Sequence, residues 1–394
     1  MNEASPVRYL VLFFITIAVI LIPVVIGNYL IDPLLIHQWD TPLLQRLQPH
    51  QEKLIPWGKT YAIYKYQPQV LFIGNSRTEV GLPADSKMFG NKRVLNGAIL
   101  GGRIWHDIAM LQHARNVSKL ETVVWGVDYW SFTPNEGNPD FDKDLISEGD
   151  YYNVRRTLLD LKRSLSFDIT WESIKLVLGQ TKGVCRSSLV FYGQRDEACD
   201  NANLVDRGGV TKALLLDIRA VKDINKNRKK PILAYRLELE QLCKAGIRVM
   251  LYINPSHATS LEYFFQQDNG NDLELWKRDL VNVTNGVREE GCNVQLFDFS
   301  GFNSVTTENI PQVSGKPAMQ NFWEASHYRT VVGRQILARM IPLVEEKVPA
   351  DFGVELDKSN IDAHLLRIHS ERMRYRAEHP QELFLMDKWF GVEK

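Results

Sequence analysis

The feature that most constrains this chain is the uncharged stretch Tyr9–Ile31, which reads YLVLFFITIAVILIPVVIGNYLI. As a helix it would be about 34 Å long, against about 30 Å of hydrocarbon in a bilayer. Cleaved signal peptides have a shorter apolar region and a small-residue cleavage site, and no Ala-x-Ala motif occurs here. The stretch therefore predicts an uncleaved membrane anchor at 9–31, with a buried core helix as the alternative.

The charges beside the anchor predict its orientation. Arg8 lies on the short N-terminal side, and Asp32 follows the apolar stretch. The positive-inside rule then places residues 1–8 in the cytoplasm as a short stub. We expect a single-pass protein of the cytoplasmic membrane that contacts the bilayer through residues 9–31. Residues 32–66 would be a membrane-proximal linker, and the remaining chain would be periplasmic or extracellular.

The four cysteines suit an oxidising compartment. None has CxxC spacing, which argues against zinc or thioredoxin-like chemistry. Cys185 and Cys199 flank one loop, while Cys243 and Cys292 each stand where a predicted helix gives way to a strand. We expect disulfides between Cys185 and Cys199 and between Cys243 and Cys292. The alternative is four reduced, half-buried thiols.

Beyond residue 66 the chain alternates short apolar stretches with helical patterns, which is typical of a parallel sheet covered by helices. Strands are predicted at Val70–Ile73, Val94–Leu95, Thr122–Trp125, Arg248–Ile253 and Val294–Phe297. Helices are predicted at Trp105–Asn116, Ile232–Ala245, Leu273–Glu290 and Arg329–Glu345.

The fold class is therefore α/β, with one domain at 67–347 and a helical insertion at 134–230 after the third strand. The insertion could shape a substrate groove or could be peripheral. A C-terminal helical extension at 348–394 would pack on the domain or contact lipid or another protein.

Charge and composition exclude some functions. Lys plus Arg and Asp plus Glu each total 47, so the net charge is zero, which argues against a nucleic-acid partner. The sequence shows no cluster of metal ligands, no phosphate-binding glycine loop and no dinucleotide fingerprint in the right context. We therefore expect no cofactor and no metal.

Two short segments carry candidate catalytic residues. Ser76 follows the first predicted strand in QVLFIGNSRTEVGL, and ligands of parallel sheets bind beyond the carboxyl ends of strands. Glu324 and His327 stand in NFWEASHYRTVV, just before the last predicted helix. A serine nucleophile needs a base, and the base needs an orienting carboxylate. Taken singly, these segments could equally be a turn and a helix cap.

Together, in this order, the two segments resemble the SGNH (GDSL-like) hydrolase superfamily. IGNSR matches its Gly-Asp-Ser-like block, with Asn75 in the Asp position, and EASH matches its Asp-x-x-His block, with Glu324 in the Asp position. The resemblance implies a flavodoxin-like three-layer fold. It also implies Ser76 as nucleophile, His327 as base and Glu324 as the orienting acid.

The family's other blocks imply the oxyanion donors. Gly97, after the second strand, matches the glycine whose amide holds the oxyanion together with the amide of Ser76. Asp128 stands where the third block has an asparagine, and an ionised carboxylate cannot donate a hydrogen bond. Asp128 would be protonated, position Arg77 or bind a sugar hydroxyl, or it would be a structural residue that caps a turn. His257, after the fourth strand, is a further candidate for substrate contact or, less favoured, for the base, with a structural role as the alternative.

The single anchor narrows the resemblance to the membrane-anchored proteins of exopolysaccharide and alginate O-acetylation. It implies acyl transfer, most simply of acetyl, through a covalent Ser76 ester to a cell-surface polysaccharide. A membrane-bound O-acyltransferase would be the partner on the donor side. Two alternatives stay open: an esterase or deacetylase that uses the same residues with water, and a non-catalytic polysaccharide-binding or scaffold subunit.

Overall fold

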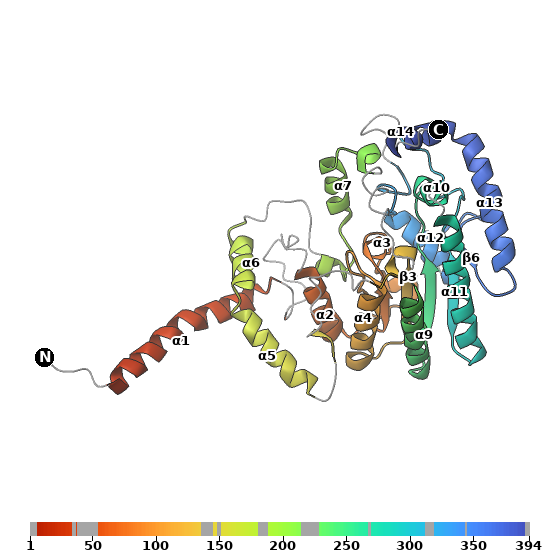
Figure 1. The fold of residues 1–394 in the computed structure, drawn as a ribbon. Helices are drawn as coiled ribbons and strands as arrows, with labels where there is room; N and C mark the ends of the chain where they lie inside the picture. Colours follow the sequence, from red (N-terminus) through yellow and green to blue (C-terminus); the bar gives the residue numbers. More distant parts are fainter. Residues whose placement is uncertain are drawn as a thin grey trace.

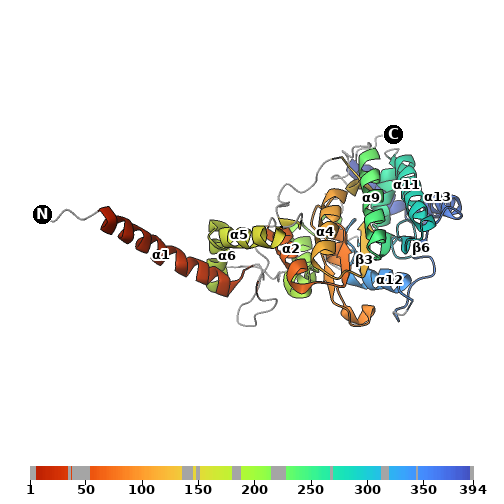
Figure 2. The same ribbon diagram turned by 90° about the horizontal axis from the view of Figure 1, so that it is seen from below.

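The computed structural model describes residues 6–33, 37, 54–134, 145–147, 151–179, 188–213, 228–266, 269–311, 319–342 and 345–390. Figure 1 shows an α/β body from which helix α1 (Pro6–Ile31) reaches away, and Figure 2 shows the same arrangement from below. Within the described ranges, α1 is the one helix long and apolar enough to cross a membrane. Its most apolar stretch has no part buried against the rest of the chain.

The body is built on a six-stranded sheet with the order β2-β1-β3-β4-β5-β6. All neighbouring strands are parallel except β6, which runs antiparallel to β5. The strands are β1 (Val70–Ile73), β2 (Val94–Asn96), β3 (Thr122–Val127), β4 (Arg248–Ile253), β5 (Val294–Asp298) and β6 (Val354–Glu355). The α/β class with a mostly parallel sheet is thus confirmed.

Helices cover both faces of the sheet, because alternate strand residues point to opposite sides. Leu71 and Ile73 of β1 join one hydrophobic core, while Val70 and Phe72 join the other. The first core contains residues of α2 (Leu54–Tyr66), α4 (Ile104–Val117), α9 (Lys229–Lys244) and α11 (Asn269–Glu289). The second contains residues of α3 (Ser76–Gly81) and α12 (Thr330–Met340).

Two helices differ from the sequence-based expectation. Helix α12 ends at Met340 and not near residue 345, because Pro342 disfavours helical backbone at Ile341, which is extended. Helix α2 lies inside the segment expected to be a linker. Its residues Tyr61, Ala62 and Ile63 are fully buried, so the folded body begins before residue 67.

The C-terminal extension is part of the body. Strand β6 pairs with β5, and α13 (Ile361–Glu378) places Leu365 and Ile368 in the first core. Arg372 of α13 donates to the buried Glu262 of α10 (Ala258–Gln266) at 2.7 Å. Helix α14 (Pro380–Phe390) follows α13.

The insertion after β3 contains α5 (Tyr152–Ser164), α6 (Phe167–Val177) and α7 (Glu197–Asp206). The expected disulfide between Cys243, near the end of α9, and Cys292, just before β5, is present. Cys199 is also disulfide-bonded. Its expected partner, Cys185, lies outside the described residues.

Candidate active site

Ser76 is the first residue of helix α3, in a tight turn after strand β1. Gly74 in this turn has φ +147°, a conformation that side-chain-bearing residues rarely adopt, and a Cβ there would lie 2.5 Å from Thr78 Oγ1. The side chain of Asn75 caps the helix by accepting a hydrogen bond from the Arg77 amide at 3.0 Å. The turn therefore holds the half-buried Ser76 at the carboxyl edge of the sheet.

His327 reaches the same edge from a tight loop that precedes α12. The loop is closed by a bridge between Phe322 and Tyr328 and by the Trp323 amide, which donates to the His327 carbonyl at 2.8 Å. Inside it, the buried Glu324 carboxylate accepts the backbone amides of Ser326 at 2.8 Å and His327 at 2.9 Å. The carboxylate thus fixes the loop that carries the imidazole.

The three residues named from the sequence form one chain of hydrogen bonds. His327 Nε2 lies 2.8 Å from Ser76 Oγ, and His327 Nδ1 contacts Glu324 Oε1. Ser76 and His327 are 251 positions apart in the sequence, whereas Glu324 and His327 are only 3 apart. This is the arrangement in which a carboxylate orients an imidazole that can take a proton from a serine hydroxyl.

Two glycines let the supporting helices come together. A Cβ at Gly333 in α12 would lie 1.9 Å from the carbonyl oxygen of Gly81 in α3. A Cβ at Gly81 would lie 2.2 Å from the ring of Tyr328. The helix that begins with Ser76 and the helix that follows His327 therefore pack at backbone contact. The sequence shows both glycines, but nothing in it pairs them.

Gly97 does not provide the expected oxyanion donor. Its amide donates to the Phe72 carbonyl at 2.8 Å, which continues the pairing of β2 with β1. The expectation for Gly97 is therefore wrong. The Ser76 amide lies in the first turn of α3, where helix amides have no partner within the helix. Gly102, from the loop that follows Gly97, packs on the turn that carries Ser76: a Cβ there would lie 3.6 Å from Asn75 Cα.

Asp128 is the centre of a buried polar cluster behind Ser76. Its carboxylate accepts from Asn75 Nδ2 at 2.6 Å, from the Arg77 guanidinium at 2.9 Å and from Asn254 Nδ2 at 3.0 Å. Arg77 also donates to Ser256 Oγ at 2.9 Å and stacks on the Trp130 ring at 3.8 Å. Of the roles considered for Asp128, the geometry is that of a counter-ion that positions Arg77 and Asn75.

Sequence reasoning missed Asn254 and Ser256, which share this cluster. Both follow strand β4 in the segment NPSH, so their place at the end of a strand was the available signal.

His257 has a structural place. Its ring is fully buried, with Nδ1 2.8 Å from Thr259 Oγ1 and Nε2 2.6 Å from the Glu308 carbonyl oxygen. Burial lowers the pKa of this imidazole below its ordinary value. Because both ring nitrogens are occupied inside the protein, His257 offers no contact to a substrate. Of the roles considered for His257, the contacts agree with the structural one and not with substrate contact or the base.

Part of the insertion lies against the candidate site, which agrees with the first of the two alternatives given for it from the sequence. The Arg195 amide donates to the Glu79 carbonyl of α3 at 2.9 Å, and Arg195 Nε lies 3.1 Å from Asp200 Oδ1 of α7. Burial raises the pKa of Asp200 to about 7, while the charges of Arg195 and His327 oppose the rise. Asp200 is thus close enough to His327 for the two charges to interact.

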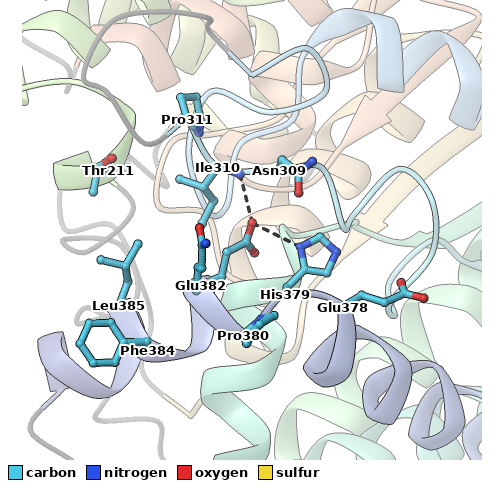
Figure 3. Close-up of a pocket in the computed structure, with 11 residues that line it drawn as sticks. Thr211, Asn309, Ile310, Pro311, Glu378, His379, Pro380, Glu382, Phe384 and Leu385 are labelled. Atoms are coloured by element: carbon cyan, nitrogen blue, oxygen red, sulfur yellow. Dashed lines mark hydrogen bonds and ion pairs between the residues drawn. The ribbon is translucent and has the colours of Figure 1, made fainter.

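A separate pocket of about 930 Å³ opens beside the turn that joins α13 to α14 (Figure 3). At its floor the Glu382 carboxylate accepts the Ile310 amide at 3.1 Å and lies 3.5 Å from His379 Nδ1. None of Ser76, Glu324 and His327 lines this pocket. Within the described ranges, no group of three His, Cys, Asp or Glu residues is arranged to hold a metal ion.

The fold and this geometry define an α/β domain with a Ser-His-Glu constellation at the carboxyl edge of a parallel sheet. No protein-family model matches the chain, and neither does any curated protein sequence.

Proposed function

We propose that this protein is a membrane-anchored SGNH-type acyltransferase that works outside the cytoplasm and passes an acyl group, most simply acetyl, to a cell-surface polysaccharide. The hydrogen-bonded chain from Ser76 through His327 to Glu324 carries the proposal. The position of Ser76 directly after the first strand of a parallel sheet supports the SGNH assignment. Helix α1 supports the anchor, and the disulfides support an oxidising compartment.

In the first half-reaction, Ser76 Oγ attacks the carbonyl carbon of the acyl donor while His327 Nε2 removes the hydroxyl proton. The carbonyl oxygen becomes an oxyanion, which the Ser76 amide is placed to stabilise. The bond from carbon to the donor's leaving group then breaks, and His327 gives its proton to that group. The acyl group is left as an ester on Ser76.

In the second half-reaction, a sugar hydroxyl replaces the donor. His327 removes the proton of this hydroxyl, the alkoxide oxygen attacks the Ser76 ester, and the proton returns to Ser76 Oγ as the ester bond breaks. Glu324 stabilises the imidazolium in both steps. Water in place of the sugar would give hydrolysis by the same residues.

The supply of the acyl group to a domain outside the cytoplasm requires a second protein. Acetyl-CoA does not cross membranes, and one predicted span cannot form a path for an acyl group. We therefore propose a multi-spanning O-acyltransferase that supplies the acyl group from the cytoplasm, with the Asp128 cluster holding the nucleophile turn in place for the transfer.

The test is the intact mass of the full chain in lipid nanodiscs after incubation with p-nitrophenyl acetate. We expect one acetyl group on the wild type, mapped to Ser76, and none on Ser76→Ala. Ser118→Ala is the matched control, because Ser118 caps the far end of α4. It should be acetylated like the wild type. Glu324→Gln should slow acetylation by about 10³–10⁴.

The way in which the Ser76 ester is lost distinguishes an acyltransferase from an esterase. Faster loss of the acetyl group on addition of an oligosaccharide, with acetylated sugar as product, supports transfer. Loss at the same rate in water alone identifies an esterase. A folded protein that forms no adduct, even with its membrane partner present, would refute catalysis and favour the scaffold alternative.

A further inference from the structure

In the helical hairpin α5–α6 of the insertion, the charged side chains are buried and the apolar side chains are exposed, the reverse of the usual arrangement. Its inner side carries the charged residues Arg156, Arg163, Glu172 and Lys175, all buried. Its outer side carries large apolar residues that are exposed, such as Leu158 at 63% and Phe167 at 77%. In a soluble domain, the apolar face of such helices would turn toward the core. An exposed apolar face of this kind marks a contact with another molecule or with a membrane.

The exposed apolar residues form one stripe on each helix. The stripes contain Val154, Leu158, Leu161 and Leu165 in α5 and its end, and Phe167, Trp171, Ile174 and Leu178 in α6 and its end. Both sets follow the spacing of four, three and four residues that keeps side chains on one helix face. The sequence alone predicts the amphipathic pattern, but only the structure shows that the apolar face points outward.

The inner face of the hairpin is fixed to the body. The Arg156 guanidinium stacks on the ring of Tyr61, in α2, at 3.8 Å, and the Arg156 side chain is buried. Lys175 pairs with Glu172 within α6. The outward direction of the apolar face of α5 is therefore set by a contact on the other side of that helix, while the charges buried on α6 pair with each other.

The hairpin also contacts the end of α1. Asn28 Nδ2 donates to the Ser164 carbonyl at 2.7 Å and to Thr170 Oγ1 at 2.9 Å, and so joins α1 to the turn between α5 and α6. Asn28 is near the end of the apolar stretch of α1 and is itself buried. Figures 1 and 2 both show the hairpin between α1 and the α/β body.

We propose that the α5–α6 hairpin lies in the interface of the bilayer that α1 spans, with its apolar face in contact with lipid. This inference rests on the membrane anchor of the proposed function. The contact with α1 indicates that lipid covers the apolar face, because the hairpin meets the anchor where the anchor leaves the hydrocarbon. A lipid interface also suits the aromatic residues of the face and the basic residue at its border.

The aromatic residues of the stripe and a basic residue beside it have the chemistry expected at a lipid interface. The rings of Phe167 and Trp171 are stacked, with centroids 6.2 Å apart and an angle of 8°. Tryptophan, as at position 171, is enriched at the level of lipid headgroups. By helical periodicity, the exposed Lys162 lies at one border of the apolar stripe of α5, where its charge can reach phosphate groups while its stem lies along apolar surface.

The proposal has a mechanical consequence. The body would be attached to the membrane at two places, through α1 and through the hairpin. Two attachments limit rotation about α1, so Ser76 would keep a fixed height and direction above the bilayer. A nucleophile that collects an acyl group from a protein within the membrane benefits from such a restraint.

The test measures the depth of nitroxide labels on the full chain in nanodiscs of phosphatidylcholine and phosphatidylglycerol, at one copy per disc. No described cysteine carries a free thiol, so one introduced cysteine is the labelling site in each variant. The variants are Ile174→Cys on α6, Leu233→Cys on α9 as the matched exposed control, and Ile15→Cys on α1. Power saturation compares the access of oxygen, which enters lipid, with that of a nickel chelate, which stays in water.

We expect oxygen access to exceed nickel access at positions 15 and 174, and the reverse at 233. Lipid exposure at 15 with water exposure at 174 would overturn the hairpin inference and leave the anchor intact. Low access of both reagents at 174 would mean contact with protein, and would also overturn it. Water exposure at 15 would refute the anchor, and the hairpin inference with it. Circular dichroism of each variant confirms that it is folded.

Discussion

At the scale of single residues, position 128 separates this chain from the family that it resembles. The family has an asparagine that donates to the oxyanion, whereas Asp128 accepts hydrogen bonds from Asn75, Arg77 and Asn254. A buried guanidinium needs a counter-charge, and Asp128 supplies it to Arg77 at 2.9 Å. In this structure Asp128 is therefore the counter-ion of Arg77, the residue that directly follows Ser76.

Asp128→Asn tests this reading, because it would restore the family's asparagine. We expect it to lower the free energy of unfolding by about 3–5 kcal/mol, since it leaves Arg77 buried without its counter-ion. Displacement of the nucleophile turn should also slow acetylation of Ser76 by roughly 10²-fold. Chemical denaturation and the mass assay measure the two effects.

A double variant provides the control. Arg77→Gln with Asp128→Asn removes both charges and should recover part of the lost stability. A single Asp128→Asn variant that is as stable as the wild type and reacts as fast or faster would instead show that position 128 serves the oxyanion.

Sequence reasoning could name the three residues of the Ser-His-Glu chain because each lies beside a recognisable strand or helix boundary. It could not assign the second oxyanion donor, expected at Gly97. Strand β2 extends to Asn96, and the next amide, of Gly97, still pairs with β1. Which loop amide is free depends on strand register to a single residue, and an apolar pattern does not fix register that finely.

At the scale of elements, α7 is the part of the insertion that meets the candidate site. Glu197, in its first turn, accepts a hydrogen bond from Thr330 at the start of α12. Asp200 of the same helix is buried, and its Oδ2 has no hydrogen-bond partner within the described structure. The fit of α7 to the site therefore depends on the protonation of one carboxyl group.

The pKa of Asp200, raised to about 7 mainly by burial, predicts how this fit changes with pH. An unfolded Asp has a pKa near 3.9, so the folded state binds the proton more tightly. The stabilising effect is therefore complete below about pH 4 and is lost as the pH rises to about 7. We expect hydrogen exchange in α7, corrected for the intrinsic rate, to be faster at pH 8 than at pH 5.5.

Asp200→Asn should remove most of this dependence, because the amide imitates the protonated acid. Between pH 5.5 and pH 8 the loss of protection in the wild type should not exceed about 2 kcal/mol, at about 1.4 kcal/mol for each pH unit below the folded pKa. Protection of α7 that increases with pH, or an equal dependence in Asp200→Asn, would contradict this assignment.

Some strands and helices could be predicted from the sequence and others could not. Strands β1 and β4 have the predicted bounds, because parallel strands buried on both faces are continuous apolar stretches. Helix α2 was missed because successive residues, Thr60 to Ile63, are all buried, so no amphipathic period marks it. Strand β6 has only two residues, too few for any pattern.

At the scale of the whole molecule, the carboxyl ends of the strands carry the candidate site, and the amino ends carry the disulfide. Ser76 follows β1 at the carboxyl edge, and the polar cluster around Asp128 follows β3 and β4 at that same edge. Cys243 and Cys292 come before β4 and β5, so their disulfide closes the opposite, amino edge. Because parallel strands all end at one edge, chemistry and cross-linking are separated by the length of the strands.

This separation predicts that the disulfide contributes to stability and not to reactivity. The bond joins residues 49 positions apart, which corresponds to about 4 kcal/mol in the chain-entropy model. We expect Cys243→Ala with Cys292→Ala to lower the melting temperature by roughly 5–10 °C. Acetylation of Ser76 well below that temperature should proceed at the rate of the wild type.

Circular dichroism of the full chain in nanodiscs measures the melting temperature, and the mass assay measures the reaction. The double variant is required, because a reducing agent would also open the bond of Cys199. An unchanged melting temperature would show that the body is already held together at this edge by β4, β5 and α9. A slower reaction at full stability would contradict the separation, since it would couple the amino edge of the sheet to the nucleophile turn at the other end.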